Sequence, residues 1–127
     1  MSVPEDGAGG QPTVVLVEDD VALRDALRFA FEIEGWLVLV GGSGEDLLAL
    51  PLPLGRFCIV SDLRLPGMTG IEALQQLRRR GVDEPAILIT GPPSAAERRA
   101  AGKVRARFVE KPLVSDELLS VVREVLA

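Results

Sequence analysis

Polar side chains that suit a binding site stand at the ends of several short apolar runs. The run FCIV at positions 57–60 leads to Asp62, and the chain then breaks at Pro66-Gly67. Three other runs end alike: TVVLV reaches Glu18, Asp19 and Asp20, AILI reaches Thr90, and RARFVE reaches Lys111. If these runs are parallel strands, the polar side chains meet at one edge of a sheet, because open parallel sheets hold ligands beyond the C-terminal ends of their strands.

The residue types at these positions favour phosphoryl chemistry with a divalent ion. Glu18, Asp19 and Asp62 offer only carboxylate oxygens, and hard oxygen ligands in a compact group favour Mg²⁺, which bridges to phosphate. An aspartate can also be the nucleophile of phosphoryl transfer and form an acyl phosphate. The Lys111 ammonium and the Thr90 hydroxyl suit the oxygens of such a group.

Each of these residues also has an ordinary structural interpretation. An acid after a strand is most often a turn residue, and the acids at 18–20 could start a helix, whose first turn favours negative charge. Asp20 is expected to have that capping role in either case. Thr90 could be a simple strand-end hydroxyl, and Lys111 a surface charge. Their joint placement at the ends of four runs is what favours a shared site.

The elements that must position these residues alternate along the chain. Strands are expected at 13–17, 36–40, 57–60, 86–90 and 106–110. Helices are expected at 21–34, 43–50, 69–80, 94–101 and from Ser115 onward. The apolar side of the first helix is assigned to Leu23, Ala26, Leu27, Ala30, Phe31 and Ile33. This alternation predicts a single α/β domain over 13–127, a doubly wound five-stranded parallel sheet with helices on both faces, after a flexible tail at 1–12.

The composition excludes several function classes. The chain has no histidine, so histidine-based catalysis and histidine metal ligands are excluded. Cys58 is the one cysteine and lies in an apolar run, so we interpret it as a core residue, which fits a reducing cytoplasm. The net charge of −5, without a basic stripe, argues against direct nucleic-acid binding. No apolar stretch reaches the roughly 20 residues of a membrane span, and no export signal precedes residue 11.

Four blocks carry a family resemblance. VLVEDD, IVSDLRLPGMTG, ILITG and FVEKP occur in that order, and their order and spacing resemble the receiver domain of two-component response regulators over 13–127. The motifs ITG and FVEKP are most similar to the corresponding motifs of FixJ-like transcriptional regulators. The resemblance implies a flavodoxin-like or CheY-like fold with strand order 2-1-3-4-5. It also implies Mg²⁺ as cofactor and a sensor histidine kinase as the phosphoryl donor.

At matching positions the resemblance implies a role for each acidic residue. Asp62 is implied as the phosphoacceptor. Glu18 and Asp19 are implied as Mg²⁺ ligands together with Asp62 and the backbone carbonyl of Arg64. The chain would thus assist its own phosphorylation and dephosphorylation and would not turn over a metabolite.

The resemblance also implies which residues respond to the phosphoryl group. Thr90 and Lys111 would contact it, Lys111-Pro112 would be a cis peptide, and Phe108 would be an aromatic switch residue. A plain core phenylalanine is the alternative for Phe108. The segment at 91–105 has two prolines and lacks the family's usual glycine-alanine turn, so helix 94–101 is expected to differ from a typical member.

Phosphorylation is expected to switch one face, formed by the fourth helix, the fifth strand and the fifth helix, for output or homodimer formation. Leu119 and Leu126 suggest such a dimer face, although both could complete the core. A phosphorylation-independent interaction module is a second hypothesis. A third is a phosphatase with an aspartyl nucleophile, but such enzymes usually place a second acid two residues beyond the nucleophile, where this chain has Arg64.

Overall fold

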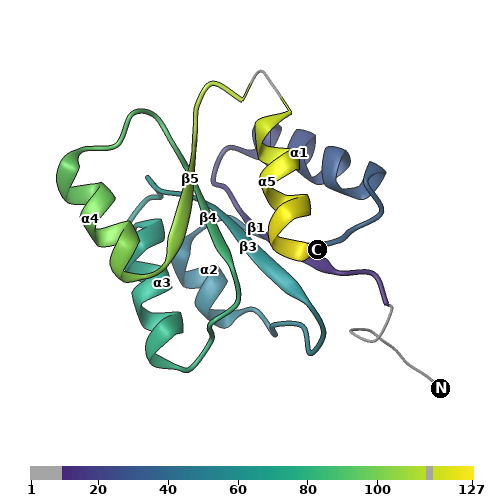
Figure 1. The fold of residues 1–127 in the computed structure, drawn as a ribbon, viewed down its shortest axis with the longest axis horizontal. Helices are drawn as coiled ribbons and strands as arrows, with labels where there is room; N and C mark the ends of the chain where they lie inside the picture. The colour runs from purple at the N-terminus through teal and green to yellow at the C-terminus, as the bar shows by residue number, and fades with distance from the viewer. Residues whose placement is uncertain (1–9, 114–115) are drawn as a thin grey trace.

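The computed structural model describes residues 10–113 and 116–127. Strands and helices alternate through this part of the chain, in the predicted order (Figure 1). The strands are β1 (Thr13–Val17), β2 (Leu37–Gly41), β3 (Phe57–Asp62), β4 (Ala86–Thr90) and β5 (Ala106–Glu110). The helices are α1 (Val21–Ile33), α2 (Gly44–Ala49), α3 (Gly70–Arg79), α4 (Ala95–Lys103) and α5 (Glu117–Leu126). Most of the predicted tail, and Ser115, lie outside the described residues.

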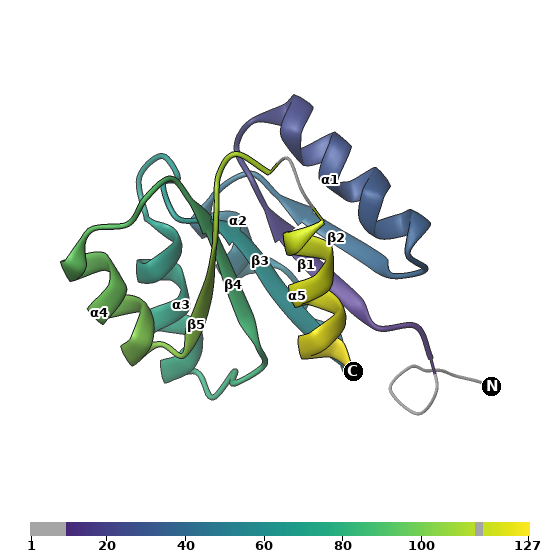
Figure 2. The same cartoon turned by 45° about the horizontal axis from the view of Figure 1, so that its top comes forward.

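The five strands form one parallel sheet in the order β2-β1-β3-β4-β5, which confirms the predicted fold class and strand order. Figure 2 shows α1 and α5 on one face of the sheet and α3 and α4 on the other. Because every strand pair is parallel, the C-terminal ends of β1, β3, β4 and β5 lie along the same edge of the sheet.

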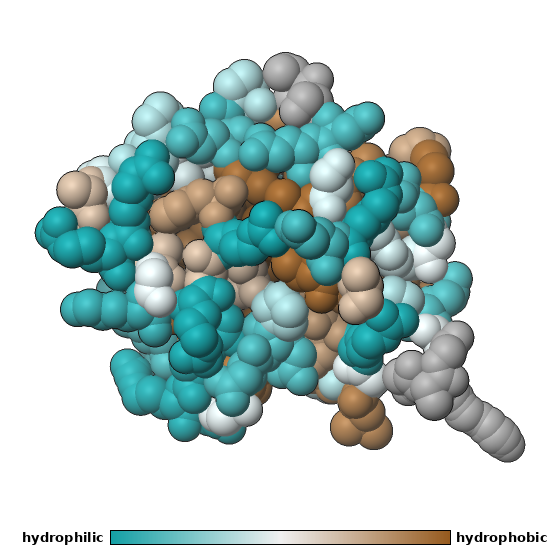
Figure 3. Space-filling view, viewed as in Figure 1, coloured by the Kyte–Doolittle hydropathy of each residue, from teal (hydrophilic) through white to brown (hydrophobic). Residues whose placement is uncertain are grey.

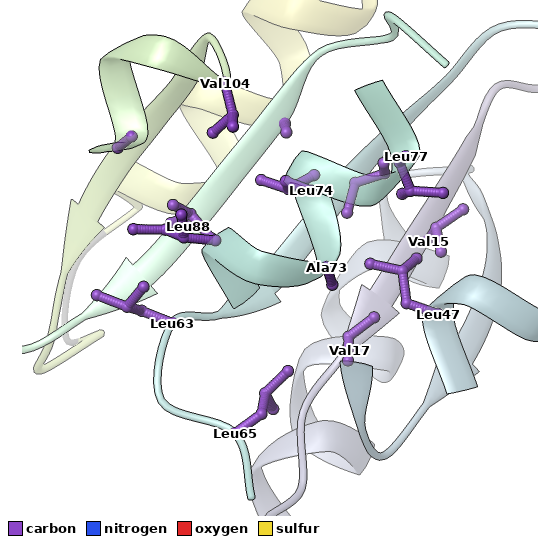
Figure 4. Close-up of a cluster of buried hydrophobic side chains, with 14 of the residues drawn as sticks. Val15, Val17, Leu47, Leu63, Leu65, Ala73, Leu74, Leu77, Leu88 and Val104 are labelled. Atoms are coloured by element: carbon purple, nitrogen blue, oxygen red, sulfur yellow. The ribbon is translucent and has the colours of Figure 1, made fainter. Parts of the chain in front are cut away.

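The core consists of two clusters, one on each face of the sheet. Successive strand residues point to opposite faces, so Val15 and Ile59 join α2, α3 and α4, whereas Val14 and Val60 join α1 and α5. Figure 4 shows the first cluster, in which Leu74 and Leu77 of α3 lie over the strands. The strands β1, β3 and β4 are buried along their whole length, as near-continuous apolar runs predict.

The predicted buried side of α1 is wrong at two positions. Leu27 and Phe31 are buried, but Ala26 and Ile33 are exposed, and Ile33 keeps 67% of its surface. Leu27 and Phe31 are four residues apart and therefore lie on one side, while Ala26 and Ile33 lie about 100° or more around the helix from Leu27. Helical spacing alone did not decide which flank faces the sheet.

Several element boundaries also differ from the predictions. β2 begins at Leu37 because Trp36 belongs to the turn after α1, where its backbone N–H donates to the carbonyl of Phe31 at 3.3 Å. Asp62 is the last residue of β3, not a residue beyond the strand. α4 reaches Lys103, two residues farther than predicted, and is a regular nine-residue helix.

The two leucines assigned to a dimer face on α5 belong to the core. Leu126 is only 5% exposed and lies in the cluster with Phe31 and Val122. Leu119 is partly buried and packs against the same cluster. Neither residue therefore supplies an exposed apolar surface for a second subunit.

Cys58 is a core residue, as predicted, and its thiol should be inert in the native protein. Burial raises the pKa of this thiol to about 12, so almost no thiolate is present near pH 8. We expect iodoacetamide to alkylate Cys58 completely in concentrated urea and negligibly in native buffer over the same time, as measured by intact mass. Equal labelling in the two buffers would contradict the buried position.

Among the described residues, no helix has the length and apolar character that crossing a membrane requires.

Candidate functional site

Three carboxylates converge where β1 and β3 end. Glu18 and Asp19 follow β1 directly, and Asp62 ends β3, which pairs with β1 in register through Val17 and Ser61. One carboxylate oxygen of each acid lies within 4.8 Å of the others. The predicted meeting of these side chains is therefore confirmed as geometry.

Glu18 is the most buried of the three acids. Glu18 is 2% exposed, its Oε2 accepts a hydrogen bond from the Asp20 backbone N–H at 3.1 Å, and its Oε1 is buried without a hydrogen-bond partner among the described residues. Burial raises the pKa of Glu18 to about 7, and the negative charge of Asp62 adds to that rise. A buried, unpaired carboxylate oxygen is costly unless a cation satisfies it.

This donor set fits Mg²⁺. Glu18, Asp19 and Asp62 supply only hard oxygen atoms, and the orphaned Oε1 of Glu18 is an oxygen that an ion at this cluster would engage. Asp19 is exposed, so the cluster is open to solvent on one side. Asp20 does not belong to this set, since its side chain caps α1 by accepting from the Leu23 N–H at 3.1 Å, as predicted.

Lys111 brings a positive charge to the acids from the end of β5. Its Nζ donates to Asp62 Oδ2 at 2.7 Å. Although burial opposes the charge, the hydrogen bond to Asp62 and the charges of Asp62, Glu18 and Asp19 raise the pKa of Lys111. The Lys111-Pro112 peptide is cis, as the family resemblance implied. Lys111 therefore stays protonated and partly offsets the negative charge of the cluster.

Backbone contacts fix the position of Asp62. Its Oδ1 accepts from the Arg64 N–H at 2.9 Å, and its carbonyl accepts from the Ser61 hydroxyl at 2.9 Å. Gly70, the first residue of α3, lies so close that a Cβ there would be 2.6 Å from the Asp62 carbonyl oxygen. Only glycine permits this approach. We did not predict this role for Gly70; the only signal was a glycine at the start of a helix eight positions after Asp62.

Thr90 lies at the end of β4, whose Ile89 pairs in register with Asp62. It is 1% exposed, and its hydroxyl accepts a hydrogen bond from Arg64 Nη1. The other terminal nitrogen of Arg64 contacts Glu97 of α4. The sequence predicts a role only for the backbone carbonyl of Arg64, and it does not indicate these side-chain contacts.

Phe108 lies on β5, two residues before the strand's end. It is partly buried and packs against the core cluster formed with α2, α3 and α4. Its strand partner is Leu88, two residues before Thr90 on β4. This position is compatible with both the switch and the core interpretation, so the switch role stays a prediction.

Together the three acids form an acidic pocket with the Lys111 ammonium beside it, and Thr90 ends β4 at the same edge of the sheet. A divalent cation would satisfy the carboxylates, and a phosphoryl group on Asp62 would lie beside Lys111.

Comparisons with known proteins indicate which chemistry the pocket serves. A family model described as the response regulator receiver domain matches residues 14–123.

Relatives and solved structures agree with this match. The transcriptional regulatory protein FixJ of Azorhizobium caulinodans is 37% identical over 116 residues, which cover 89% of this chain and 54% of that protein. The non-phosphorylated HemR receiver domain of Leptospira biflexa superposes with a TM-score of 0.84 at 27% identity, over 92% of this chain and 95% of that one. The response regulator StyR gives a TM-score of 0.79 at 30% identity, over 92% and 60%. This chain thus spans about half the length of the FixJ relative.

Proposed function

This chain belongs to the response regulator receiver domain family of two-component signalling, and we propose that it accepts a phosphoryl group on Asp62 from a partner histidine kinase. The observation that carries the proposal is the pocket itself. Three carboxylates lie within 4.8 Å of one another, and Lys111 Nζ is 2.7 Å from Asp62 Oδ2. A structural role alone would not require this concentration of buried and half-buried charge.

In the proposed reaction a carboxylate oxygen of Asp62 attacks the phosphorus of a phosphohistidine. The phosphorus–nitrogen bond breaks, the imidazole of the donor leaves, and an acyl phosphate forms on Asp62. These 127 residues contain no histidine, so the donor histidine would lie outside them. The Arg64 N–H and the Lys111 ammonium hold the two oxygens of Asp62 in place, which makes catalysis mainly a matter of positioning.

Mg²⁺ would be held by Glu18, Asp19, Asp62 and the backbone carbonyl of Arg64, and it would reduce the repulsion between the carboxylate and the incoming phosphoryl group. The Lys111 ammonium would also reduce this repulsion, from the end of β5, and the Thr90 hydroxyl at the end of β4 would donate to a phosphoryl oxygen. The same pocket would admit water for the later loss of the phosphoryl group. The chain would thus be a self-modifying switch and not a turnover enzyme.

The switch is proposed to act through β4, β5 and α4. A phosphoryl group adds roughly −1.5 to −2 charge, which attracts the Lys111 ammonium at the end of β5 and the Thr90 hydroxyl at the end of β4. Movement of these strand ends would carry Phe108 with them and shift a pre-existing equilibrium.

The output face would be the surface of α4, β5 and α5. Figure 3, drawn in the view of Figure 1, shows hydrophobic surface in the middle of this face with hydrophilic side chains around it. Arg98 pairs with Glu110 at 3.6 Å, and Arg107 pairs with Glu124, so ion pairs join the three elements. We propose this face for output or for homodimer formation, without direct nucleic-acid binding by this chain. A cytoplasmic location is part of the proposal.

Two alternatives differ in what they expect of the pocket. An aspartyl-nucleophile phosphatase usually has a second acid at the place of position 64, whereas Arg64 stands there and its guanidinium is bonded to Thr90 and Glu97. A phosphorylation-independent interaction module would take up no phosphoryl group even with Mg²⁺ present. Phosphoryl uptake therefore separates the second alternative from the proposal.

Removal of Mg²⁺ should abolish phosphoryl uptake. We expect one phosphoryl group per chain from acetyl phosphate with Mg²⁺, and a rate at least about a hundredfold lower with EDTA, because a metal supplies several kcal/mol of charge stabilisation. Intact mass spectrometry measures both rates, and circular dichroism checks that EDTA does not unfold the chain. Equal rates with and without EDTA would contradict the metal's role, and no uptake in either case would favour the interaction module.

A further inference from the structure

We propose that Arg64 and Glu97 form a latch that ties Thr90 to the first turn of α4 while Asp62 carries no phosphoryl group. The inference concerns the regulation of the same pocket and rests on the proposed function. The latch would be a positioning device: it would connect the loop after Asp62 with α4, and its opening would transmit the state of Asp62.

The Arg64 guanidinium spans three parts of the fold. Its Nη1 donates to Thr90 Oγ1 on β4, and its Nη2 lies 3.1 Å from Glu97 Oε1 and 3.2 Å from Glu97 Oε2 on α4. Arg64 itself is two residues beyond Asp62 in the chain. The planar guanidinium presents its donors in a fixed fork, so one side chain holds both partners at once.

Glu97 joins the latch to the start of α4. It is the third residue of the helix, and its Oε1 also accepts from the Ser94 N–H at 2.8 Å, while its own N–H donates to Ser94 Oγ at 3.0 Å. Oε1 thus receives hydrogen bonds from both the cap and Arg64. A shift of Arg64 therefore disturbs the capping box that starts α4.

α4 has little else to hold its first turn. The only buried side chain of this helix is Ala101, which lies in its second half. Figure 1 shows α4 at the periphery of the molecule. Helices with few buried contacts open locally at low free-energy cost, so polar contacts at the first turn have a large share in its order. Loss of the Arg64 contact should therefore destabilise the first turn of α4 before the rest of the helix.

A phosphoryl group on Asp62 competes for two members of the latch. The Thr90 hydroxyl would be drawn toward the phosphoryl oxygens, and Arg64 is itself a favourable partner for them. Room for this motion exists, because Arg64 and Glu97 line a surface cavity together with Ile71 and Ala100. Movement of either Thr90 or the guanidinium would break the side-chain link between β4 and α4. This break would couple phosphorylation to the output face.

The test is hydrogen exchange of the first-turn amides of α4 in the wild type, Glu97→Gln and Arg98→Ala, with and without acetyl phosphate and Mg²⁺. Glutamine still completes a capping box but removes the charge that holds Arg64. Arg98 is a matched control: its side chain is 58% exposed against 55% for Arg64, and its ion pair is with Glu110.

Before phosphorylation, Glu97→Gln should exchange about two- to fivefold faster than the wild type, as the loss of one partly exposed ionic contact predicts. Arg98→Ala should match the wild type. Phosphorylation should raise exchange in the wild type and in Arg98→Ala, and should change it little in Glu97→Gln, whose latch is already open. If Glu97→Gln merely lowered the general stability of the protein, phosphorylation would still raise the exchange of its α4 amides.

Arg64→Ala, compared only before phosphorylation, should show the same faster exchange, and the double variant with Glu97→Gln should be no faster than either single variant. If the wild type gains no phosphoryl mass, the proposed function fails, and the resting exchange of these variants still decides whether the tie to α4 exists. If the wild type gains the mass but Glu97→Gln and Arg98→Ala exchange and respond alike, the latch is overturned.

Discussion

Asp62→Asn should give a folded protein that takes up no phosphoryl group. The amide is a poor nucleophile, so the acyl phosphate cannot form, while its oxygen can still accept from the Arg64 N–H that Asp62 Oδ1 engages at 2.9 Å. Removal of one negative charge also reduces the repulsion that raises the pKa of Glu18. We expect native circular dichroism and no phosphoryl mass after treatment with acetyl phosphate and Mg²⁺.

Asp20→Asn is the matched control for this variant. Asp20 adjoins Glu18 and Asp19, but its side chain caps α1, and asparagine is an equally good N-cap residue. This variant should take up one phosphoryl group as the wild type does. Phosphoryl uptake by Asp62→Asn at the wild-type rate would show that another group is the acceptor.

Lys111→Ala should uncouple phosphorylation from the structural change that normally follows it, so that this change is lost. Lys111 is the cation at the end of β5, and its Nζ is 2.7 Å from Asp62 Oδ2, so its removal takes away the cation beside the acceptor through which a phosphoryl group would draw β5. Mg²⁺ affinity should be retained or raised, because an ammonium that repels the ion is gone. The pKa of Glu18 should rise above its value of about 7, since the charge of Lys111 lowers it.

Sedimentation velocity with and without beryllofluoride, a phosphoryl mimic, measures this separation if the wild type self-associates, and hydrogen exchange of the β5 amides measures it in any case. The mimic should change the wild type and leave Lys111→Ala almost unchanged, whereas Arg79→Ala, which removes an exposed cation from α3, should respond fully. A full response of Lys111→Ala would mean that its side chain is only a surface charge.

The sequence was sufficient to predict the fold and the meeting of the site residues. Short apolar runs identify buried parallel strands, and parallel strands bring their C-terminal ends to one edge, so Glu18, Asp62 and Lys111 lie close together there, and Thr90 ends β4 at the same edge. The assignment of Ile33 to the core failed because an apolar residue at the flank of a helical stripe has no periodic signal for the side that the sheet covers.

Features that depend on contacts across the fold were not predictable. Arg64 and Glu97 are 33 residues apart, and nothing in their spacing indicates that the Arg64 guanidinium contacts both Glu97 and Thr90. Gly70 was missed because its role is a 2.6 Å approach to a backbone oxygen, which only the packed structure shows. The unpaired oxygen of Glu18 depends on burial depth, which composition and periodicity do not specify.

The most direct test of the central claim is to locate the acyl phosphate. Borohydride reduces an aspartyl phosphate to homoserine, so the protein is treated with acetyl phosphate and Mg²⁺, reduced, digested and mapped by mass spectrometry. We predict homoserine at position 62 and at no other acidic residue, and none when acetyl phosphate is omitted. Homoserine at position 19 or 20, or none at any position in a folded protein that binds Mg²⁺, would contradict the assignment of Asp62 as the phosphoacceptor.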